Sequence, residues 1–374
     1  MNLKTLAMLG TGLFVAAPVA AQSPAITELI QRLEIGETET ASREMPGWSR
    51  PSKITVLVPF AMPEAGPGSR QWIRDAVGGI EIEFLDPARN DFSVARLADS
   101  EVMVGFCSAA AIAAGVELRY IHILSAGVEG CASNPAIASR GIITTNSAKA
   151  ASETIAEHGI ALMLALTRNL QGHHRAQMRA EWGGDEGGAT VAVTGKTMLV
   201  LGLGGIGSQV ALRAHHLGMR VIGTRNSSRE GPAYVDYVGL SSETVSLARQ
   251  ADVVVNALPL TSRTRGVVGA EFFANLKPNA TYVSVGRGAT TDTDALVAAL
   301  KSGKLLGAGL DVTDPEPLPP THELWKLPNV LLTPHMASDG DLSTLNTWLI
   351  AGENLRRYVR GEKLLNLVDL ARGY

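Results

Sequence analysis

Residues 197–218 read Thr197-Met-Leu-Val-Leu-Gly-Leu-Gly-Gly-Ile-Gly-Ser-Gln-Val-Ala-Leu-Arg-Ala-His-His-Leu-Gly218. An apolar run typical of a buried strand leads into a glycine turn, and a helical pattern follows. Gly202 permits a tight turn, Gly204 lets the backbone approach a pyrophosphate, and Gly207 lets the helix pack closely on the strand. The N-terminus of such a helix attracts phosphate. The stretch therefore predicts a dinucleotide site, which includes Gly205 and Ile206.

The end of the next strand bears on the choice of cofactor. Enzymes that use NAD usually place an acid there, whereas this chain places Arg225 18 residues after Gly207. A guanidinium binds the 2′-phosphate of NADP(H) better than it binds the two free ribose hydroxyls of NAD(H). The sequence thus predicts a preference for NADP(H), with use of NAD(H) and a merely solvated arginine left open. The residues assigned to this subsite are Thr224, Arg225, Asn226 and Ser227.

Three polar residues farther along the chain indicate the chemistry. Arg287 lies in Ser-Val-Gly-Arg-Gly, Glu316 follows it by 29 residues, and His335 follows Glu316 by 19. A guanidinium matches a carboxylate and polarises a neighbouring ketone, and an imidazole exchanges a proton near neutral pH. A carboxylate beside the imidazole orients the ring. Each residue alone is more often structural, but together they fit the reduction of a 2-keto acid.

With these motifs the chain resembles the D-isomer-specific 2-hydroxyacid dehydrogenases, in particular the glyoxylate/hydroxypyruvate reductase-like branch. The resemblance runs from about Asp99 to Leu370. It implies that Arg287, Glu316 and His335 are the catalytic residues. It also implies that residues 152–168 form a long helix that packs in a homodimer.

The resemblance implies further site residues. Backbone N–H groups of Gly127 and Val128 would meet the substrate carboxylate, and Ser338 is a candidate for a hydrogen bond to the substrate. The remaining residues assigned to the cofactor are Leu258, Pro259, Thr264, Val285, Gly286 and Asp311. Asp339 departs from the small residues that the family tends to place after the histidine, and Phe106 and Cys107 identify no particular acid.

Apolar strands alternate with helical stretches from residue 54 to residue 332. This alternation predicts an α/β protein with two Rossmann-like or flavodoxin-like, doubly wound parallel-sheet domains and an active-site cleft between them. Residues 149–335 would form the dinucleotide-binding domain, and residues 51–148 with 336–374 the substrate-binding domain. Residues 22–50 would be a charged, helix-compatible N-terminal extension.

The composition suits a globular protein. Apolar residues make up 45% and charged residues 18% of 374, which suffices for two cores. A formal net charge of −3 and the lack of a basic patch argue against nucleic acid as a partner. No metal motif is found. Adjacent histidines occur at residues 173–174 and 215–216, but neighbours on a predicted helix point apart, so these pairs do not suit metal ligands.

The first residues predict export. Lys4 precedes a mostly apolar run from Leu6 to Ala17, and small residues around Ala21 suit a signal peptidase. We therefore interpret residues 1–21 as a cleaved signal peptide that directs the protein to the periplasm, and expect no stable membrane insertion. NADP(H) is supplied in the cytoplasm, and the chain lacks the paired arginines of folded export, so a cytoplasmic location is the alternative. Cys107 and Cys131 are either a disulfide or two free thiols.

Together these features predict a reductase that prefers NADP(H) and converts a small 2-keto acid, such as glyoxylate or hydroxypyruvate, to a D-2-hydroxy acid. The alternative from another class is a dinucleotide-binding redox sensor or corepressor-like protein without metabolic flux. A second enzyme alternative is oxidation of formate or phosphite; its formate form is disfavoured by Glu316, because the formate branch has an amide at that position.

Overall fold

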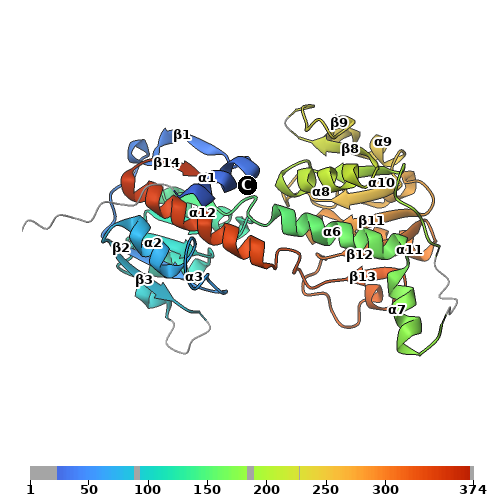
Figure 1. Cartoon of the computed structure of the whole chain (residues 1–374), viewed down its shortest axis with the longest axis horizontal. Coiled ribbons are helices and arrows are strands. Elements are labelled where there is room, and N and C mark those ends of the chain that lie inside the picture. The colour runs from blue at the N-terminus through green and yellow to red at the C-terminus, as the bar shows by residue number, and fades with distance from the viewer. Residues whose placement is uncertain (1–22, 88–92, 183–188, 227, 371–374) are drawn as a thin grey trace, which may run out of the picture.

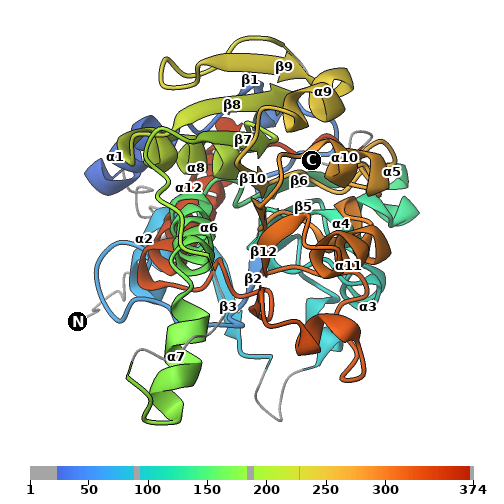
Figure 2. The same ribbon diagram turned by 90° about the vertical axis from the view of Figure 1, so that its right-hand side faces the viewer.

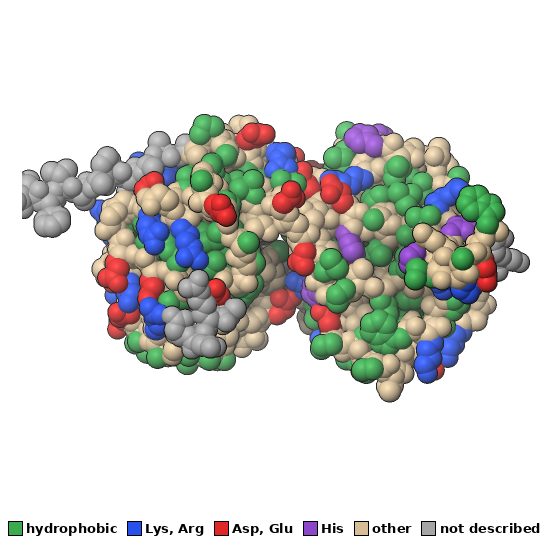
Figure 3. All heavy atoms as spheres, turned by 60° about the horizontal axis from the view of Figure 1, so that its bottom comes forward, with side chains coloured by type: hydrophobic (Ala, Val, Ile, Leu, Met, Phe, Trp, Pro, Cys, Tyr) green, Lys and Arg blue, Asp and Glu red, His purple; other side chains and the backbone are tan. Residues whose placement is uncertain are grey.

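The computed structural model describes residues 23–87, 93–182, 189–226 and 228–370. The predicted signal peptide and Ser227 lie outside these ranges. The chain forms two lobes joined at a narrow waist (Figure 1), and the space-filling surface is indented between them (Figure 3). No helix in the described ranges is long and apolar enough to cross a bilayer.

The first lobe is built on a five-stranded parallel sheet in the order β3-β2-β4-β5-β6. Nearly all side chains of β2, β4, β5 and β6 are buried because helices cover both faces. The switch point lies between β2 and β4, as in flavodoxin-like folds. The strands are β2 (Lys53–Leu57), β3 (Glu81–Leu85), β4 (Val102–Gly105), β5 (Tyr120–Ile123) and β6 (Ile143–Asn146).

Short helices connect these strands. They are α2 (Arg70–Val77), η2 (Val94–Leu97), α3 (Ala109–Ala114), α4 (Glu129–Ala132) and α5 (Pro135–Ser139). Helix η2 is a 3-10 turn of four residues, and it begins where the hydroxyl of Ser93 accepts from the N–H of Ala95.

The second lobe contains a seven-stranded parallel sheet in the order β13-β12-β11-β10-β7-β8-β9. This is the Rossmann order with one further strand, and its switch point lies between β7 and β10, next to the glycine turn. The α/β class with two doubly wound parallel sheets is thus confirmed. The strands are β7 (Thr197–Leu201), β8 (Arg220–Arg225), β9 (Tyr237–Leu240), β10 (Val253–Asn256), β11 (Ala280–Ser284), β12 (Leu305–Leu310) and β13 (Val330–Leu332).

Helices on both faces bury this second sheet. They are α7 (Leu170–Met178), α8 (Gly205–His216), η3 (Ser241–Glu243), α9 (Thr244–Ala248), α10 (Ala270–Asn275), η4 (Gly288–Thr290), α11 (Thr293–Lys301) and η5 (Glu323–Lys326). Helix α11 starts at the cap Asp292 and stops before Gly303, whose φ of +72° suits glycine.

Two long helices start near the waist, and one of them runs into each lobe (Figure 1). Helix α6 (Ser152–Thr167) leaves the first lobe and packs on α8, β11 and β12. Helix α12 (Asp341–Arg360) returns and packs on α2 and β5. Fifteen residues of α12 are buried, among them Trp348 and Tyr358, so this helix is the central layer of the first lobe rather than a surface addition.

The N-terminal extension is ordered against the first lobe. Helix α1 (Pro24–Arg32) is followed by strand β1 (Glu37–Ala41) and the turn η1 (Ser42–Glu44), and β1 pairs antiparallel with β14 (Lys363–Leu365). The helical character expected for this segment holds for α1. Strand β1 was not predicted, because its sequence Glu-Thr-Glu-Thr-Ala carries little apolar character and only the partner strand fixes it.

Candidate active site

The loop after β11 carries Arg287, and close backbone contact fixes its position. A Cβ at Gly288 would overlap the carbonyl oxygen of Thr313, so only glycine lets this loop lie against the loop that leads to Glu316. The guanidinium donates from Nη1 to the oxygen of Gly286 at 2.9 Å. The glycine thereby brings two of the three predicted catalytic residues onto adjacent loops.

Glu316 and His335 form a direct pair. Oε1 of Glu316 lies 2.5 Å from Nδ1 of His335, and about two fifths of each side chain is exposed. A carboxylate only accepts hydrogen bonds, so Nδ1 carries the proton in this pair. Nε2 has no hydrogen-bond partner within the described ranges and is available to a ligand.

His335 has a left-handed backbone, with φ of +54°. Non-glycine residues reach this region at a cost, and the surroundings must hold them there. Asp311, directly after β12, does so: its carbonyl accepts from the N–H of His335 at 2.8 Å, and its carboxylate accepts from the N–H groups of Met336 and Ala337 at 3.0 Å each. Asp311 is 3% exposed, and it positions the histidine loop.

A second contact to Asp311 comes from the loop before the histidine. Oγ1 of Thr333 donates to Oδ1 of Asp311 at 2.7 Å and lies 2.9 Å from Nε2 of His158 on α6. Helix α6 therefore braces the loop that presents His335. A contact of Asp311 with a nicotinamide amide stays a prediction.

Glu129 is the site residue that sequence reasoning missed. It begins α4 in the first lobe, and its Oε1 accepts from Nε of Arg287 in the second lobe at 2.9 Å. Partial burial opposes ionisation of its carboxyl, but Arg287 and, to a lesser extent, His335 outweigh it and lower its pKa. Glu129 thus lies among the predicted catalytic groups and links the two lobes. An acid directly after Gly127-Val128 was the available indication.

The predicted substrate loop follows β5 and faces Arg287. A Cβ at Gly127 would overlap Nη2 of Arg287 and lie 2.6 Å from Oε2 of Glu129. Within the described chain, Nη2 has no hydrogen-bond partner. Val128 is buried, and the hydroxyl of Ser125 donates to the oxygen of Gly127 at 3.0 Å, which holds the loop. Ser338 lies exposed three residues after His335.

The predicted cofactor cradle has the expected geometry. Gly202 has φ of +90°, and a Cβ at Gly207 would overlap the oxygen of Gly202, so α8 packs directly on the turn. The N–H of Gly202 donates to Oγ1 of Thr224 at 3.2 Å, which ties the turn to β8. A Cβ at Gly204 would meet nothing within 4 Å. The turn, including Gly205 and Ile206, leaves room for a pyrophosphate at the start of α8 and so fits a nicotinamide dinucleotide.

The other predicted cofactor residues lie on neighbouring loops at the carboxyl ends of the strands. A Cβ at Gly286 would lie 2.6 Å from the oxygen of Leu258, so the loops after β10 and β11 touch. Oγ1 of Thr264 donates to the oxygen of Pro259 at 2.6 Å. Val285 is buried, whereas Arg225 at the end of β8 donates from Nε to the oxygen of Leu203 at 3.0 Å. Asn226 follows Arg225.

Cys107 and Cys131 form a disulfide, with 5.2 Å between their Cα atoms. It connects the loop after β4 with α4, which carries Glu129. In the described ranges no cluster of His, Cys, Asp or Glu could hold a metal ion.

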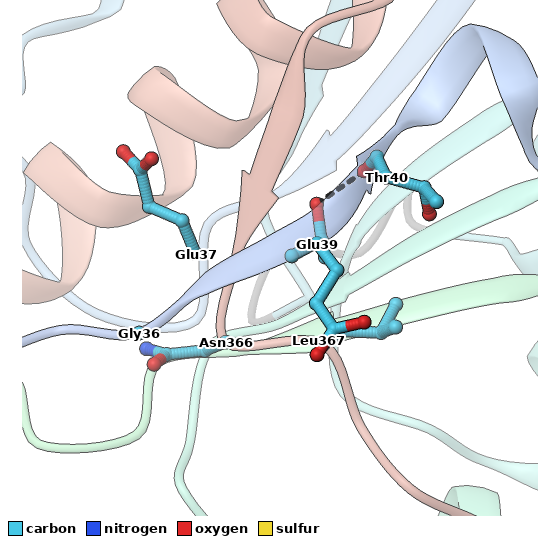
Figure 4. A pocket seen from close by; sticks show the side chains of 7 residues that line it. Gly36, Glu37, Glu39, Thr40, Asn366 and Leu367 are labelled. Carbon is cyan, nitrogen blue, oxygen red and sulfur yellow. Dashed lines mark hydrogen bonds between the residues drawn. The ribbon is translucent and has the colours of Figure 1, made fainter.

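A separate hollow lies on the two-stranded sheet (Figure 4). None of the predicted site residues lines it; its lining consists of Gly36, Glu37, Thr38, Glu39, Thr40, Asn366 and Leu367.

Two parallel sheets that meet at a cleft, a glycine turn at one switch point and an arginine, a glutamate and a histidine at the strand ends define a nicotinamide-dependent dehydrogenase. The sequence profile of the D-isomer specific 2-hydroxyacid dehydrogenase NAD-binding domain matches residues 160–337. The chain belongs to this family, whose members are oxidoreductases that act on CH–OH donors.

Individual relatives agree. Human glyoxylate reductase/hydroxypyruvate reductase is 33% identical over 258 residues, which are 67% of this chain and 77% of that protein. Glyoxylate reductase of Korarchaeum cryptofilum is 35% identical over 243 residues, 62% and 70% of the two chains. The NADPH-dependent glyoxylate/hydroxypyruvate reductase of Sinorhizobium meliloti, solved with NADP and sulfate, has 25% identity and a TM-score of 0.72 over 86% of this chain and all of that one.

Proposed function

We propose that the protein reduces a small 2-keto acid of the glyoxylate or hydroxypyruvate type to a D-2-hydroxy acid and prefers NADP(H). The observation that carries this proposal is the group of Arg287, Glu129, His335 and Glu316 where residues of the two lobes meet, beside Gly127. A guanidinium with an unpartnered Nη2 and an imidazole with an unpartnered Nε2 provide what a keto acid needs.

Each residue has a defined part in this proposal. Nη2 of Arg287 and the N–H groups of Gly127 and Val128 bind the substrate carboxylate. His335 gives a proton from Nε2 to the oxygen of the former ketone, and Glu316 holds the ring through Nδ1. The bound dinucleotide supplies the hydride. Ser338, exposed three residues after His335, is a candidate for a hydrogen bond to the substrate.

The preference for NADP(H) rests on Arg225 at the end of β8, where an acid would favour NAD. The Sinorhizobium reductase is described as NADPH-dependent and was solved with NADP. We further propose that the protein is a homodimer that packs through α6, and that it is exported. The membership in the family supports the dimer, and the first 21 residues support export.

Purified protein is to be tested with a panel of 2-keto acids, each with NADPH and with NADH. We expect turnover with glyoxylate or hydroxypyruvate and a higher kcat/KM with NADPH. Binding of NADPH without turnover of any keto acid would favour the sensor alternative. A clear preference for NADH would contradict the role of Arg225. Mass spectrometry of the N-terminus in the native host tests export, which an intact Met1 in a cytoplasmic pool would overturn.

A further inference from the structure

A second group of cations faces a cavity beside the glycine turn. The cavity measures about 570 Å3 and is bounded by the turn and α8, by the segment after β8, by the start of α6 and by residues 32–34 of the N-terminal extension. Two basic side chains that line it, Lys149 and Arg225, form no ion pair with any carboxylate in the described ranges. Glu34 and Glu230 also line the cavity, but neither carboxylate lies within ion-pair distance of Lys149 or Arg225, so both cations are available to an anion.

Lys149 lies directly on the glycine turn. A Cβ at Gly205 would be 3.0 Å from Cγ of Lys149, and Nζ donates to the carbonyl oxygen of Glu34 at 2.5 Å. A neutral carbonyl takes up one of its three donors, and the carboxylate of Glu34 acts on its charge only from beyond ion-pair distance. The backbone of Lys149 is left-handed, with φ of +71°, a strained conformation that L residues adopt mainly where the surroundings enforce it.

The electrostatics agree with this placement. Burial lowers the pKa of Lys149, Glu34 opposes this shift, and Arg225 adds to it. Lys149 and Arg225 are thus close enough to repel each other. The guanidinium of Arg225 uses Nε for the oxygen of Leu203, and its two terminal nitrogens have no partner in the part of the chain described. A dianionic phosphate between the two side chains would relieve their repulsion.

The N-terminal extension closes this cavity from outside. Ile26, Leu29, Leu33 and Ile35 are buried against Ala150 and against Leu349, Ile350 and Leu365. Arg32 forms an ion pair with Glu153 near the start of α6. Helix α1 lies beside α12 and on the side of α8 in both ribbon views (Figures 1 and 2). The extension is therefore held in place independently of any ligand.

We propose that Lys149 and Arg225 together bind the 2′-phosphate of NADP(H), and that residues 32–34 form the outer wall of that subsite. This proposal deepens the function given above and rests on its NADP(H) preference. The cavity extends from the glycine turn along the segment after β8, and Arg225 is the last residue of β8. Because the 2′-phosphate is expected at the end of this strand, we assign it, rather than the pyrophosphate, as the ligand.

The test compares dissociation constants, measured by nucleotide fluorescence for NADPH and NADH and by calorimetry for 2′,5′-ADP and ADP-ribose. Lys149→Met should raise the dissociation constants of NADPH and 2′,5′-ADP about tenfold, as expected for the loss of one charge-assisted hydrogen bond. The dissociation constants of NADH and ADP-ribose should rise less than about twofold. Lys149→Arg should restore most of the loss. Lys301→Met is the matched control, because Lys301 pairs with Glu323 outside the cavity.

If Lys149→Met raises the dissociation constants of all four ligands equally, or changes none of them, the assignment of Lys149 is overturned. Hydrogen exchange over residues 24–36 should slow when NADPH is saturating, and unchanged exchange would overturn the role of the wall. If the wild-type protein binds NADPH no better than NADH, the proposed cofactor preference fails by itself. The effect of Lys149→Met on 2′,5′-ADP is then still measurable and decides the inference separately.

Discussion

His335 is held in a left-handed backbone by three N–H bonds to Asp311, and its Nδ1 is taken up by Glu316. The sequence identified the histidine and the glutamate but not this support, because the backbone conformation depends on β12 and β13 lying side by side. The support leaves Nε2 as the ring atom that can exchange a proton with a ligand. The proposed catalysis therefore depends on one nitrogen in one orientation.

Replacement of the histidine tests this dependence. His335→Ala should lower turnover by about 10² or more, because the general acid is lost, while the dissociation constant for NADPH changes little. Steady-state kinetics and nucleotide fluorescence measure the two effects. Turnover near that of the wild type would contradict the assignment of His335.

Glu129 places a negative charge where a substrate carboxylate is expected to bind. Glu129→Gln keeps an oxygen that can accept from Nε of Arg287 but removes the charge. We expect KM for a 2-keto acid to fall by roughly two- to fivefold, since the site is partly exposed and solvent weakens the repulsion. Initial rates at varied keto acid concentration check this, and Glu323→Gln, at a carboxylate that pairs with Lys301 away from the site, is a control. A higher KM would mean that Glu129 mainly orients Arg287.

Among the elements, α4 and the loop after β4 depend on each other. The disulfide between Cys107 and Cys131 spans 24 residues and fastens both segments next to the predicted substrate loop. The sequence left this pairing open, because spacing alone does not place two cysteines within bonding distance. Helix α4 has only four residues and little stability of its own, so the bond holds Glu129 in place.

Removal of the bond should therefore affect both stability and substrate binding. Cys107→Ser with Cys131→Ser should lower the free energy of unfolding by about 2–4 kcal/mol and raise KM for the keto acid. Urea unfolding and kinetics with and without dithiothreitol measure this. The wild-type protein should respond to the reductant, and the double variant should not. If reduction leaves both quantities unchanged, the disulfide has no such function.

Across the whole molecule, α12 joins the buried layers of the first lobe. His122 on β5 lies fully buried beneath it, with Thr145 at 2.8 Å from Nδ1, Ser147 at 3.1 Å from Nε2 and Asn354 of α12 at 3.3 Å. Burial lowers the pKa of His122 from 6.5 to about 3. The folded protein thus keeps this imidazole neutral where the unfolded chain protonates it.

The pH dependence of stability follows from this difference. The contribution of His122 is fully present above pH 6.5 and is lost as the pH falls toward about 3, with a slope of up to about 1.4 kcal/mol per pH unit. Urea unfolding from pH 7 to pH 4 should give a flatter profile for His122→Gln than for the wild type. His216→Gln, at an exposed position, should leave the profile unchanged. Parallel profiles for all three proteins would contradict the buried neutral histidine.

The sequence by itself determined the two parallel sheets, the glycine turn and the identity of Arg287, Glu316 and His335. Hydrophobic period, turn glycines and the chemistry of these side chains are local properties that can be read along the chain. The tertiary structure alone decided that Glu129 meets Arg287 across the cleft and that the extension lies over Lys149. Such contacts join residues more than 100 positions apart, and their free energy comes from burial and charge in three dimensions, which no local pattern encodes.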